Sequence, residues 1–138
     1  MGQQQLLLVI LVTIIVGIAT VVAINTFGSA ADAANIDAVR QDLASIAAAA
    51  QGHYMKPAML GGGSRSFENF SFETIAVPGE VTDAANMTNE NGDYEVTGGA
   101  AEGSSILTVV GTANNGTILT ATIEPNSVEI VQTAAATE

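Results

Sequence analysis

The chain has 138 residues, enough for one small domain, and its 14 acidic and three basic side chains give a formal net charge of -11. Only 12% of the residues are charged and 48% are hydrophobic, against about 25% charged in an average domain, so the composition excludes an ordinary cytosolic globule and a disordered acidic tail. Three basic residues argue against a nucleic-acid interface built on a basic surface, and the absence of cysteine excludes disulfides, zinc sites and a cysteine nucleophile.

The charges are distributed unevenly along the sequence. The first charged side chain is Asp32, so residues 1–31 carry none of the 14 acidic and three basic groups. A neutral, apolar segment is therefore joined to an acidic one. We expect the two segments to occupy different environments.

Residues 6–24 form an apolar run, LLLVILVTIIVGIATVVAI. As a helix this run spans roughly 28 Å, close to the thickness of the hydrocarbon core of a bilayer. Because the run is apolar on all sides, it lacks the single stripe of a helix that lies on a soluble core. It is also longer than the apolar part of a secretory signal, and no basic residue precedes it. We expect it to lie in lipid or among identical helices. Its residues of interest are Leu6, Leu7, Leu8, Val9, Ile10, Leu11, Val12, Ile14, Ile15, Val16, Gly17, Ile18, Val21, Val22 and Ile24.

The helical pattern continues beyond this run but becomes one-sided. Residues 25–54 contain no proline and are rich in alanine, a strong helix former. Apolar residues recur there at steps of three or four, and the charged residues, Asp42 among them, fall mostly on the other side. Since Pro57 disfavours helix at Lys56, we expect the helix to end near residue 54 or 55. The residues expected to dock on a sheet are Ile36, Val39, Leu43 and Ile46.

The second half of the chain changes to a period of two. Strands are predicted at residues 94–97, 105–110, 117–123 and 128–132, with a hairpin signal at Asn115-Gly116. The sequence therefore predicts an antiparallel meander of three or four strands. With the long N-terminal helix packed on it by its C-terminal half, the fold class is α+β.

These patterns divide the chain into three parts. Residues 1–54 are the long helix, with an apolar half over 1–28 and an amphipathic half over 29–54. Residues 55–92 are expected to be an irregular, Gly-rich connection, in which residues 61–63 form a flexible joint and not a phosphate loop. Residues 93–138 hold the meander and a tail.

This order of parts resembles the bacterial type IV pilins. The segment MGQQQLLLVILVTIIVGIATVVAI carries most of the likeness, which covers residues 1–54, while the sheet matches in architecture only. In that family a short basic leader ending in glycine is removed by a prepilin peptidase, which also methylates the new N-terminal amine. The resemblance implies that Met1 is this processed residue. It also implies a stretched segment in the helix, and because of Gly17 we expect a break within residues 13–24.

Two positions depart from the family pattern. Pilins usually begin with Phe and have Glu at the fifth position, where this chain has Met1 and Gln5. The family's acid pairs with the N-terminal amine of a neighbouring subunit; Gln5 cannot form that ion pair, but its carbonyl oxygen can accept a hydrogen bond. Met1 and Gln5 are therefore the candidates for subunit registration, that is, for setting the axial position of one subunit against its neighbour. In the alternative interpretation Met1 is a translation start, Gln3 begins the mature chain and Leu7 falls at the fifth position.

The resemblance implies a structural subunit of an extracellular filament, with apolar helices packed in the filament core. Its partners are copies of itself, the inner membrane before assembly, the prepilin peptidase and the pilus assembly machinery. No enzymatic activity and no cofactor are expected. Adhesion, motility and DNA uptake all fit such a filament. The alternatives are a pseudopilin of a secretion system and a monomeric, membrane-anchored surface protein that binds a ligand.

The remaining polar motifs are weak. His53 has no visible catalytic partner and is expected to be structural. A loose cluster between Asp83 and Asp93 lacks the spacing of an EF-hand, because the sixth position from Asn89 is Tyr94 and not glycine. We therefore expect no metal site. Three sequons are possible glycosylation sites, at Asn69, Asn86 and Asn115.

Overall fold

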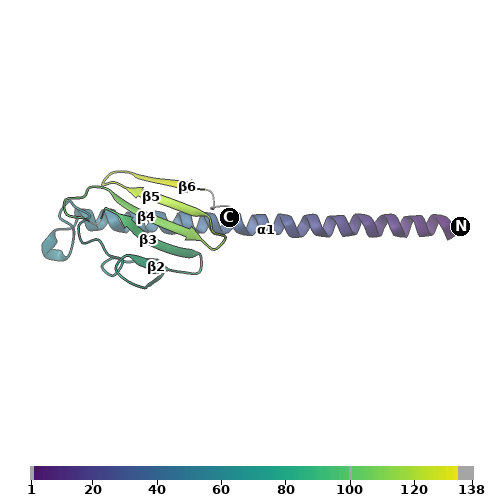
Figure 1. Cartoon of the computed structure of the whole chain (residues 1–138), viewed down its shortest axis with the longest axis horizontal. Helices are drawn as coiled ribbons and strands as arrows, with labels where there is room; N and C mark the ends of the chain where they lie inside the picture. The colour runs from purple at the N-terminus through teal and green to yellow at the C-terminus, as the bar shows by residue number, and fades with distance from the viewer. Residues whose placement is uncertain (1, 100, 134–138) are drawn as a thin grey trace. The chain divides into compact units, whose positions relative to one another are not determined.

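The computed structural model describes residues 2–99 and 101–133, and its chain divides into two compact units, Met1–Ala34 (unit 1) and Asn35–Glu138 (unit 2). The described residues form an α-helix, a short 3-10 helix and six strands (Figure 1). The predicted α+β fold is confirmed. The elements are α1 (Gly2–Met55), η1 (Ala58–Leu60), β1 (Glu80–Val81), β2 (Asn86–Thr88), β3 (Gly92–Gly98), β4 (Leu107–Ala113), β5 (Ile118–Ile123) and β6 (Val128–Thr133).

Helix α1 is continuous through unit 1, so the expected break within residues 13–24 is wrong for the single chain. The hydroxyls of Thr13 and Thr20 donate to carbonyl oxygens one turn back, at 2.7 and 2.8 Å. Glycine costs a helix only about 1 kcal/mol relative to alanine. A break would instead leave several backbone N–H and C=O groups without partners, and this larger cost keeps the helix intact.

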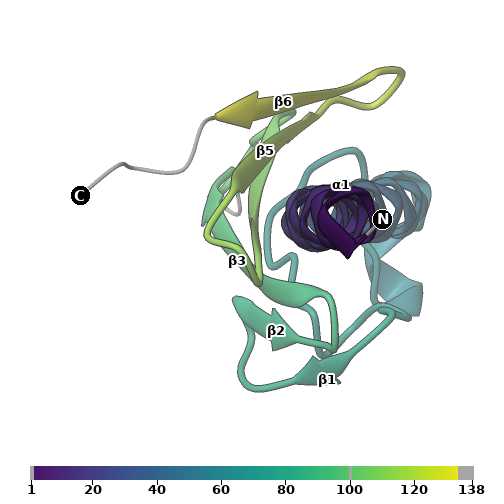
Figure 2. The same cartoon turned by 90° about the vertical axis from the view of Figure 1, so that its right-hand side faces the viewer.

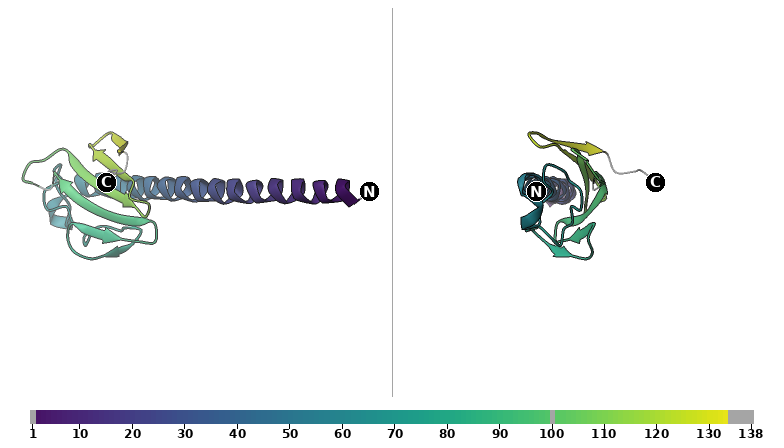
Figure 3. Two further views of the ribbon diagram at one scale, coloured as in Figure 1. Left: turned by 45° about the vertical axis from the view of Figure 1, so that its right-hand side comes forward. Right: turned by 90° about the vertical axis from the view of Figure 1, so that its left-hand side faces the viewer.

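Unit 2 contains an antiparallel sheet whose strands follow the chain order β1-β2-β3-β4-β5-β6. Each strand pairs with the next one, as expected for a meander. The sheet curves around one side of the C-terminal part of α1 (Figures 2 and 3). One sheet face is thus covered by helix, and the other faces outward.

The core of unit 2 lies between residues 36–54 of α1 and the inner sheet face. Alternate residues of β4 and β5 point inward, as the period of two predicted. Gly111 lies close under the helix: a Cβ there would be 3.0 Å from Val39 Cγ1 and 3.2 Å from Leu43 Cδ1. The largest fully buried side chains are Tyr94, Phe67, Phe72, Leu43, Ile46, Met87, Leu107, Leu119, Ile123, Val39 and Val109.

The expectation that residues 55–92 are irregular throughout is corrected by the structure. This segment contains β1 and β2, so the meander has six strands and not three or four. It also supplies the buried aromatic rings of Phe67, Phe70 and Phe72 to the core. Strands of two and three residues are too short to show a periodicity, which explains why the sequence pattern missed them.

The glycines at residues 61–63 belong to a hydrogen-bonded cap and not to a flexible joint. The N–H of Gly63 donates to the His53 carbonyl at 2.8 Å, and the next two N–H groups donate to the carbonyls of residues 56 and 54. A Cβ on Gly62 would lie 2.1 Å from the Lys56 carbonyl oxygen. Glycine is needed because the chain folds back closely to satisfy the last carbonyls of α1.

The hairpin predicted at Asn115-Gly116 is confirmed between β4 and β5. Gly116 has a φ of 83°, a left-handed conformation that suits glycine. Its N–H donates to the Ala113 carbonyl at 2.9 Å, and the Ala113 N–H donates to the Thr117 carbonyl at 2.9 Å. The turn fixes the register of the two central strands.

Candidate functional site

The most prominent feature of unit 1 is its uncovered apolar surface. Helix α1 is long and apolar enough to cross a membrane, and no residue of its most apolar window is buried. The fourteen large apolar side chains of residues 6–24 retain 51–68% of their exposure. No described residue of the chain covers them. They are Leu6, Leu7, Leu8, Val9, Ile10, Leu11, Val12, Ile14, Ile15, Val16, Ile18, Val21, Val22 and Ile24.

The small residues of this surface share one side of the helix. Thr13, Gly17 and Thr20 lie at steps of four and three, which places them in one row. A Cβ added at Gly17 would meet nothing within 4 Å. The single chain therefore has no packing reason for glycine there, whereas a neighbouring helix that approaches closely would need one.

The structure describes only one of the two residues predicted to set the register between neighbouring subunits. Gln5 is exposed in the first turns of α1. Met1 lies outside the described residues. Their predicted roles in processing and registration stay predictions.

The four residues predicted to dock the sheet all lie in unit 2. Val39, Leu43 and Ile46 are completely buried against the sheet. Ile36 is half-buried and packs at the margin of the same core. These positions hold the C-terminal part of α1 on the meander.

Polar residues of α1 also face the sheet, and the sequence pattern placed them wrongly. Asp42, expected on the exposed side, accepts hydrogen bonds at Oδ2 from the Tyr94 hydroxyl at 2.7 Å and from the Asn89 and Asn91 side-chain amides at 2.8 Å. Burial, and then the neighbouring Asp42 carboxylate, raise the pKa of Tyr94 above its ordinary value of 10.0. The network joins α1 to β3 and to the turn that precedes it.

Two further side chains fasten α1 to the turns at the ends of the sheet. Asn35 donates to the Asn91 carbonyl at 2.8 Å and accepts at 3.1 Å from the backbone N–H of Asn114. At the other end Gln51 donates to the Glu124 carbonyl at 2.9 Å. Single polar residues at the margin of an amphipathic stripe give no periodic signal, so the sequence could not assign these contacts.

The possible glycosylation sites differ in their surroundings. Asn69 is exposed and has a φ of 57°. Asn115 is exposed at the β4–β5 turn, where its Oδ1 accepts from the Thr117 N–H at 3.0 Å. The Asn86 amide donates to both oxygens of Asp83 at 3.0 Å, and this contact, followed by the Ala85 N–H, lowers the pKa of Asp83. Glycosylation at the three positions stays a prediction.

The acidic cluster and the histidine have structural partners. Among residues 2–99 and 101–133, no group of three or more His, Asp or Glu side chains is arranged to hold a metal ion. The amides of Asn89 and Asn91 point to Asp42. His53 is buried edge-to-face against Phe70, with ring centroids 5.7 Å apart.

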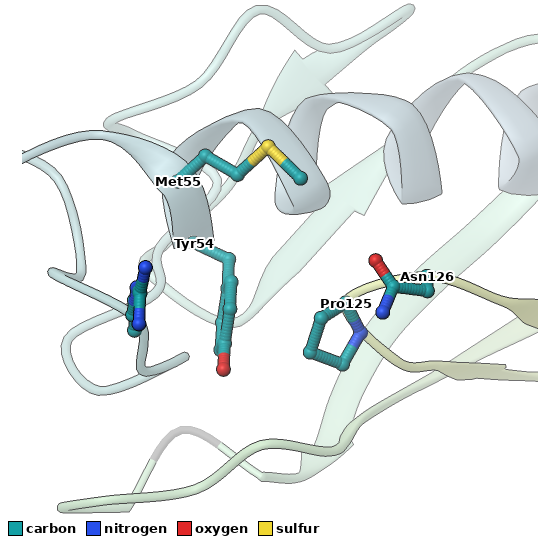
Figure 4. A pocket seen from close by; sticks show the side chains of 5 residues that line it. Tyr54, Met55, Pro125 and Asn126 are labelled. Carbon is teal, nitrogen blue, oxygen red and sulfur yellow. The ribbon is translucent and has the colours of Figure 1, made fainter.

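A hollow of about 560 Å³ opens beside the end of α1 (Figure 4). Its lining comes from the last helical turn, from the segment that caps the helix and from the β5–β6 turn. Tyr54 and Pro125 face each other across it (Figure 4), and the Tyr54 ring rests on Phe67 at a centroid distance of 5.0 Å. The lining residues are Tyr54, Met55, Arg65, Pro125 and Asn126.

Comparisons with known proteins assign no relative. No family model matches the chain, and no curated protein or solved structure matches it either.

Proposed function

We propose that the chain is the structural subunit of an extracellular filament of the type IV pilus kind, assembled by packing of the apolar N-terminal helices. The proposal rests on the conformation and the exposure of residues 6–24 in the single chain. They form an uninterrupted helix whose large apolar side chains are all exposed. Such a surface requires an apolar partner outside the chain described here.

The free energy available from this surface is large. Complete burial of a Leu, Ile or Val side chain is worth about 1.5–3 kcal/mol relative to exposure. Fourteen side chains that are 51–68% exposed therefore favour a covered state over exposure to water by on the order of 10–25 kcal/mol per subunit. Lipid and a bundle of identical helices both provide such cover.

Two properties of the helix suit a subunit that lies first in a membrane and then in a bundle of helices. Its length and apolarity suit a membrane, where the subunit resides before assembly. The absence of any charged side chain in residues 1–31 also suits a helical bundle, because an unpaired charge in its core would be costly. Through the resemblance of residues 1–54 to pilins, the inner membrane, a prepilin peptidase and an assembly machinery are proposed as partners, and the cell surface as the destination.

The proposed registration between subunits involves the N-terminal amine of Met1 and the Gln5 side chain. A neutral amide provides a hydrogen-bond acceptor but no ion pair. Registration through Gln5 is thus expected to be weaker than through a carboxylate, since charge-assisted hydrogen bonds are roughly twice as strong as neutral ones. The remaining affinity between subunits then comes mainly from close packing of the helices, because lipid already covers the apolar side chains before assembly.

We propose no catalytic role for unit 2. Its most connected polar residues, Asp42, Tyr94 and Asn35, are occupied in contacts that hold α1 to the sheet. In a filament this unit is the part that faces water, and the net charge of -11 keeps neighbouring filaments apart.

Electron microscopy of sheared cell-surface material tests the proposal. Cells that produce the chain are compared with otherwise identical cells from which its gene is deleted. We expect helical filaments from the first strain only, with this chain as the main protein by intact mass. Recovery of the chain solely in membranes, with no filaments in the sheared fraction, would contradict the proposal and favour a monomeric anchored protein or a pseudopilin.

A further inference from the structure

Unit 2 has a cluster of exposed apolar side chains at the end of α1. Met59 is 97% exposed, and Met55 and Leu60 are 68% and 66% exposed, more than any other large apolar side chain described in unit 2. The backbone that carries them is hydrogen-bonded into the cap of α1, with Gly61 N–H on the Ala58 carbonyl at 3.0 Å. These side chains are therefore held out by an ordered turn.

The same place concentrates the positive charge of the chain. Residues 51–67 contain no acidic residue and include Lys56 and Arg65, two of the three basic residues of a chain with a net charge of -11. The third basic residue, Arg40, is paired with Asp37 at 3.0 Å. We call residues 55–60 together with the lining of the 560 Å³ hollow the apex. It is an apolar surface that carries two basic residues, with the exposed Glu124 beside Pro125 at its margin.

The chain itself offers an anionic surface that complements the apex. At the other end of unit 2 the β2–β3 turn presents Glu90, which is exposed, and the exposed Asp93 follows it at the start of β3. This turn is fixed, because Asn91 and Glu90 offer their carbonyls to Asn35 and Asn114 at 2.8 Å. We call it the acidic turn.

Their positions at opposite ends of unit 2 determine what a contact between them produces. Asn35 binds the acidic turn, whereas Gln51 and Tyr54 border the apex. The sixteen helical steps from Asn35 to Gln51 span about 24 Å, so the two surfaces cannot meet within one chain. A contact between two different surfaces of identical copies is heterologous and repeats into an open chain when it does not close into a ring.

We infer that the apex of one subunit receives the acidic turn of a second copy of this chain, with Glu90 of the neighbour against Arg65 and Lys56. The inference rests on the proposed filament and names a contact between its outer units. An anionic membrane is the less suitable occupant, since lipid-binding basic segments usually carry four to eight Lys or Arg residues. The apex has two.

Cysteine crosslinking tests the contact without interference, because the chain has no cysteine of its own. The full chain carrying Glu90→Cys and Asn126→Cys is produced in cells, and sheared filaments are oxidised and run on a non-reducing gel. We expect a ladder of disulfide-linked multimers. Each single variant is expected to stay monomeric. The matched control, Glu95→Cys with Asn126→Cys, is expected to give no ladder because Glu95 lies on the exposed outer sheet face.

Each alternative result has its own meaning. Intact filaments without a ladder overturn the contact and leave the filament in place. Dimers from Asn126→Cys alone overturn the contact in favour of an apex-to-apex contact. If no ladder forms and the wild-type chain binds anionic but not neutral vesicles through Lys56 and Arg65, the contact is overturned in favour of lipid. Absence of wild-type filaments overturns both the proposed function and this contact.

A charge exchange provides a second, independent readout. Arg65→Glu places two carboxylates together at the contact and is expected to lower the yield of sheared filaments about tenfold. Glu90→Arg in the same chain is expected to restore the yield. If the double variant stays as low as Arg65→Glu while unit 2 is folded by circular dichroism, Arg65 and Glu90 are not partners.

Discussion

The hydroxyl of Tyr94 donates a hydrogen bond of 2.7 Å to the Asp42 carboxylate and joins strand β3 to helix α1. The Tyr94 ring is buried in the core, and the carboxylate also accepts two amide hydrogen bonds. The helix is thus held on the sheet by a polar network as well as by its apolar stripe. This network fixes the rotation of the helix about its own axis, and therefore which side of α1 faces outward.

Replacement of Tyr94 by Phe keeps the buried ring and removes one hydrogen bond to a carboxylate. We expect unit 2 to lose about 1.5–3 kcal/mol of unfolding free energy, the usual worth of a hydrogen bond to a charged group. Urea unfolding of the detergent-solubilised chain measures the change by circular dichroism. Tyr54→Phe is the control, because the Tyr54 ring is only half-buried. Equal losses in the two variants would mean that the hydroxyl of Tyr94 adds no specific stability.

The raised pKa of Tyr94 predicts an alkaline limit to the stability of unit 2. Since the folded state holds the phenol proton more tightly than the unfolded state, the stabilisation is complete below the ordinary pKa of 10.0 and declines as the pH rises above it. The melting temperature is expected to fall more steeply above pH 10 in the wild type than in Tyr94→Phe. Parallel pH profiles for the two proteins would contradict the assigned cause.

Gly111 is required by the close approach of α1 to the sheet. In Gly111→Ala the added Cβ would lie 3.0–3.2 Å from Val39, Leu43 and Tyr94, so we expect a loss of about 1–3 kcal/mol from overpacking. Gly98→Ala is the matched strand control, since its Cβ would have no neighbour nearer than 3.8 Å. Thermal unfolding compares the two variants. A Gly111→Ala protein as stable as Gly98→Ala would show that the helix can shift without cost.

A charged residue introduced into the apolar run is expected to prevent filament assembly without affecting the folding of unit 2. Ile15 is 56% exposed in the single chain, so Ile15→Asp is expected to leave the melting temperature of unit 2 unchanged while it abolishes filaments, because the carboxylate would be buried unpaired. Ala31→Asp adds the same charge to an exposed position of α1 outside the run. We expect it to assemble. Normal filaments from Ile15→Asp would place residues 6–24 in contact with water.

The predicted role of Gln5 is tested by changing its polarity. Gln5→Leu removes the hydrogen-bond acceptor and is expected to lower the rate of filament assembly, whereas Gln5→Glu adds an ion-pair partner for the N-terminal amine and is expected to raise it. Quantitative blotting of sheared fractions follows both variants. Equal yields from wild type, Gln5→Leu and Gln5→Glu would remove Gln5 from subunit registration.

The elements with repeated patterns could be predicted from the sequence. Periods of three to four over residues 36–54 and of two over residues 107–123 each repeat several times, and the structure shows α1, β4 and β5 there. Strands β1 and β2 have two and three residues and escaped detection. The α+β fold was therefore predictable, but the full width of the sheet was not.

Residues of the candidate surfaces were predictable to different degrees. The apolar run needs only composition, so residues 6–24 were identified directly. Asp42 was assigned to the exposed side of the helix because charge was used as a sign of exposure, yet three donors from β3 and the turn before it meet its carboxylate. The apex joins Tyr54, residues 55–60 and Arg65 with Pro125 and Asn126, and a contact between residues so distant in sequence has no local signal.

The break expected in α1 is wrong because its local signal is weak. Gly17 and its neighbouring threonines lower helix propensity by only about 1 kcal/mol each or less, which is too little to open the helix on its own. The helix is accordingly intact from Gly2 to Met55.

The position of residues 6–24 in a filament reconstructed by cryo-electron microscopy tests the central claim most directly. The account predicts that the apolar helices of many subunits pack together along the filament axis, with unit 2 on the outside. A reconstruction in which residues 6–24 face solvent, or a chain that is recovered only as a lipid-embedded monomer, would contradict it.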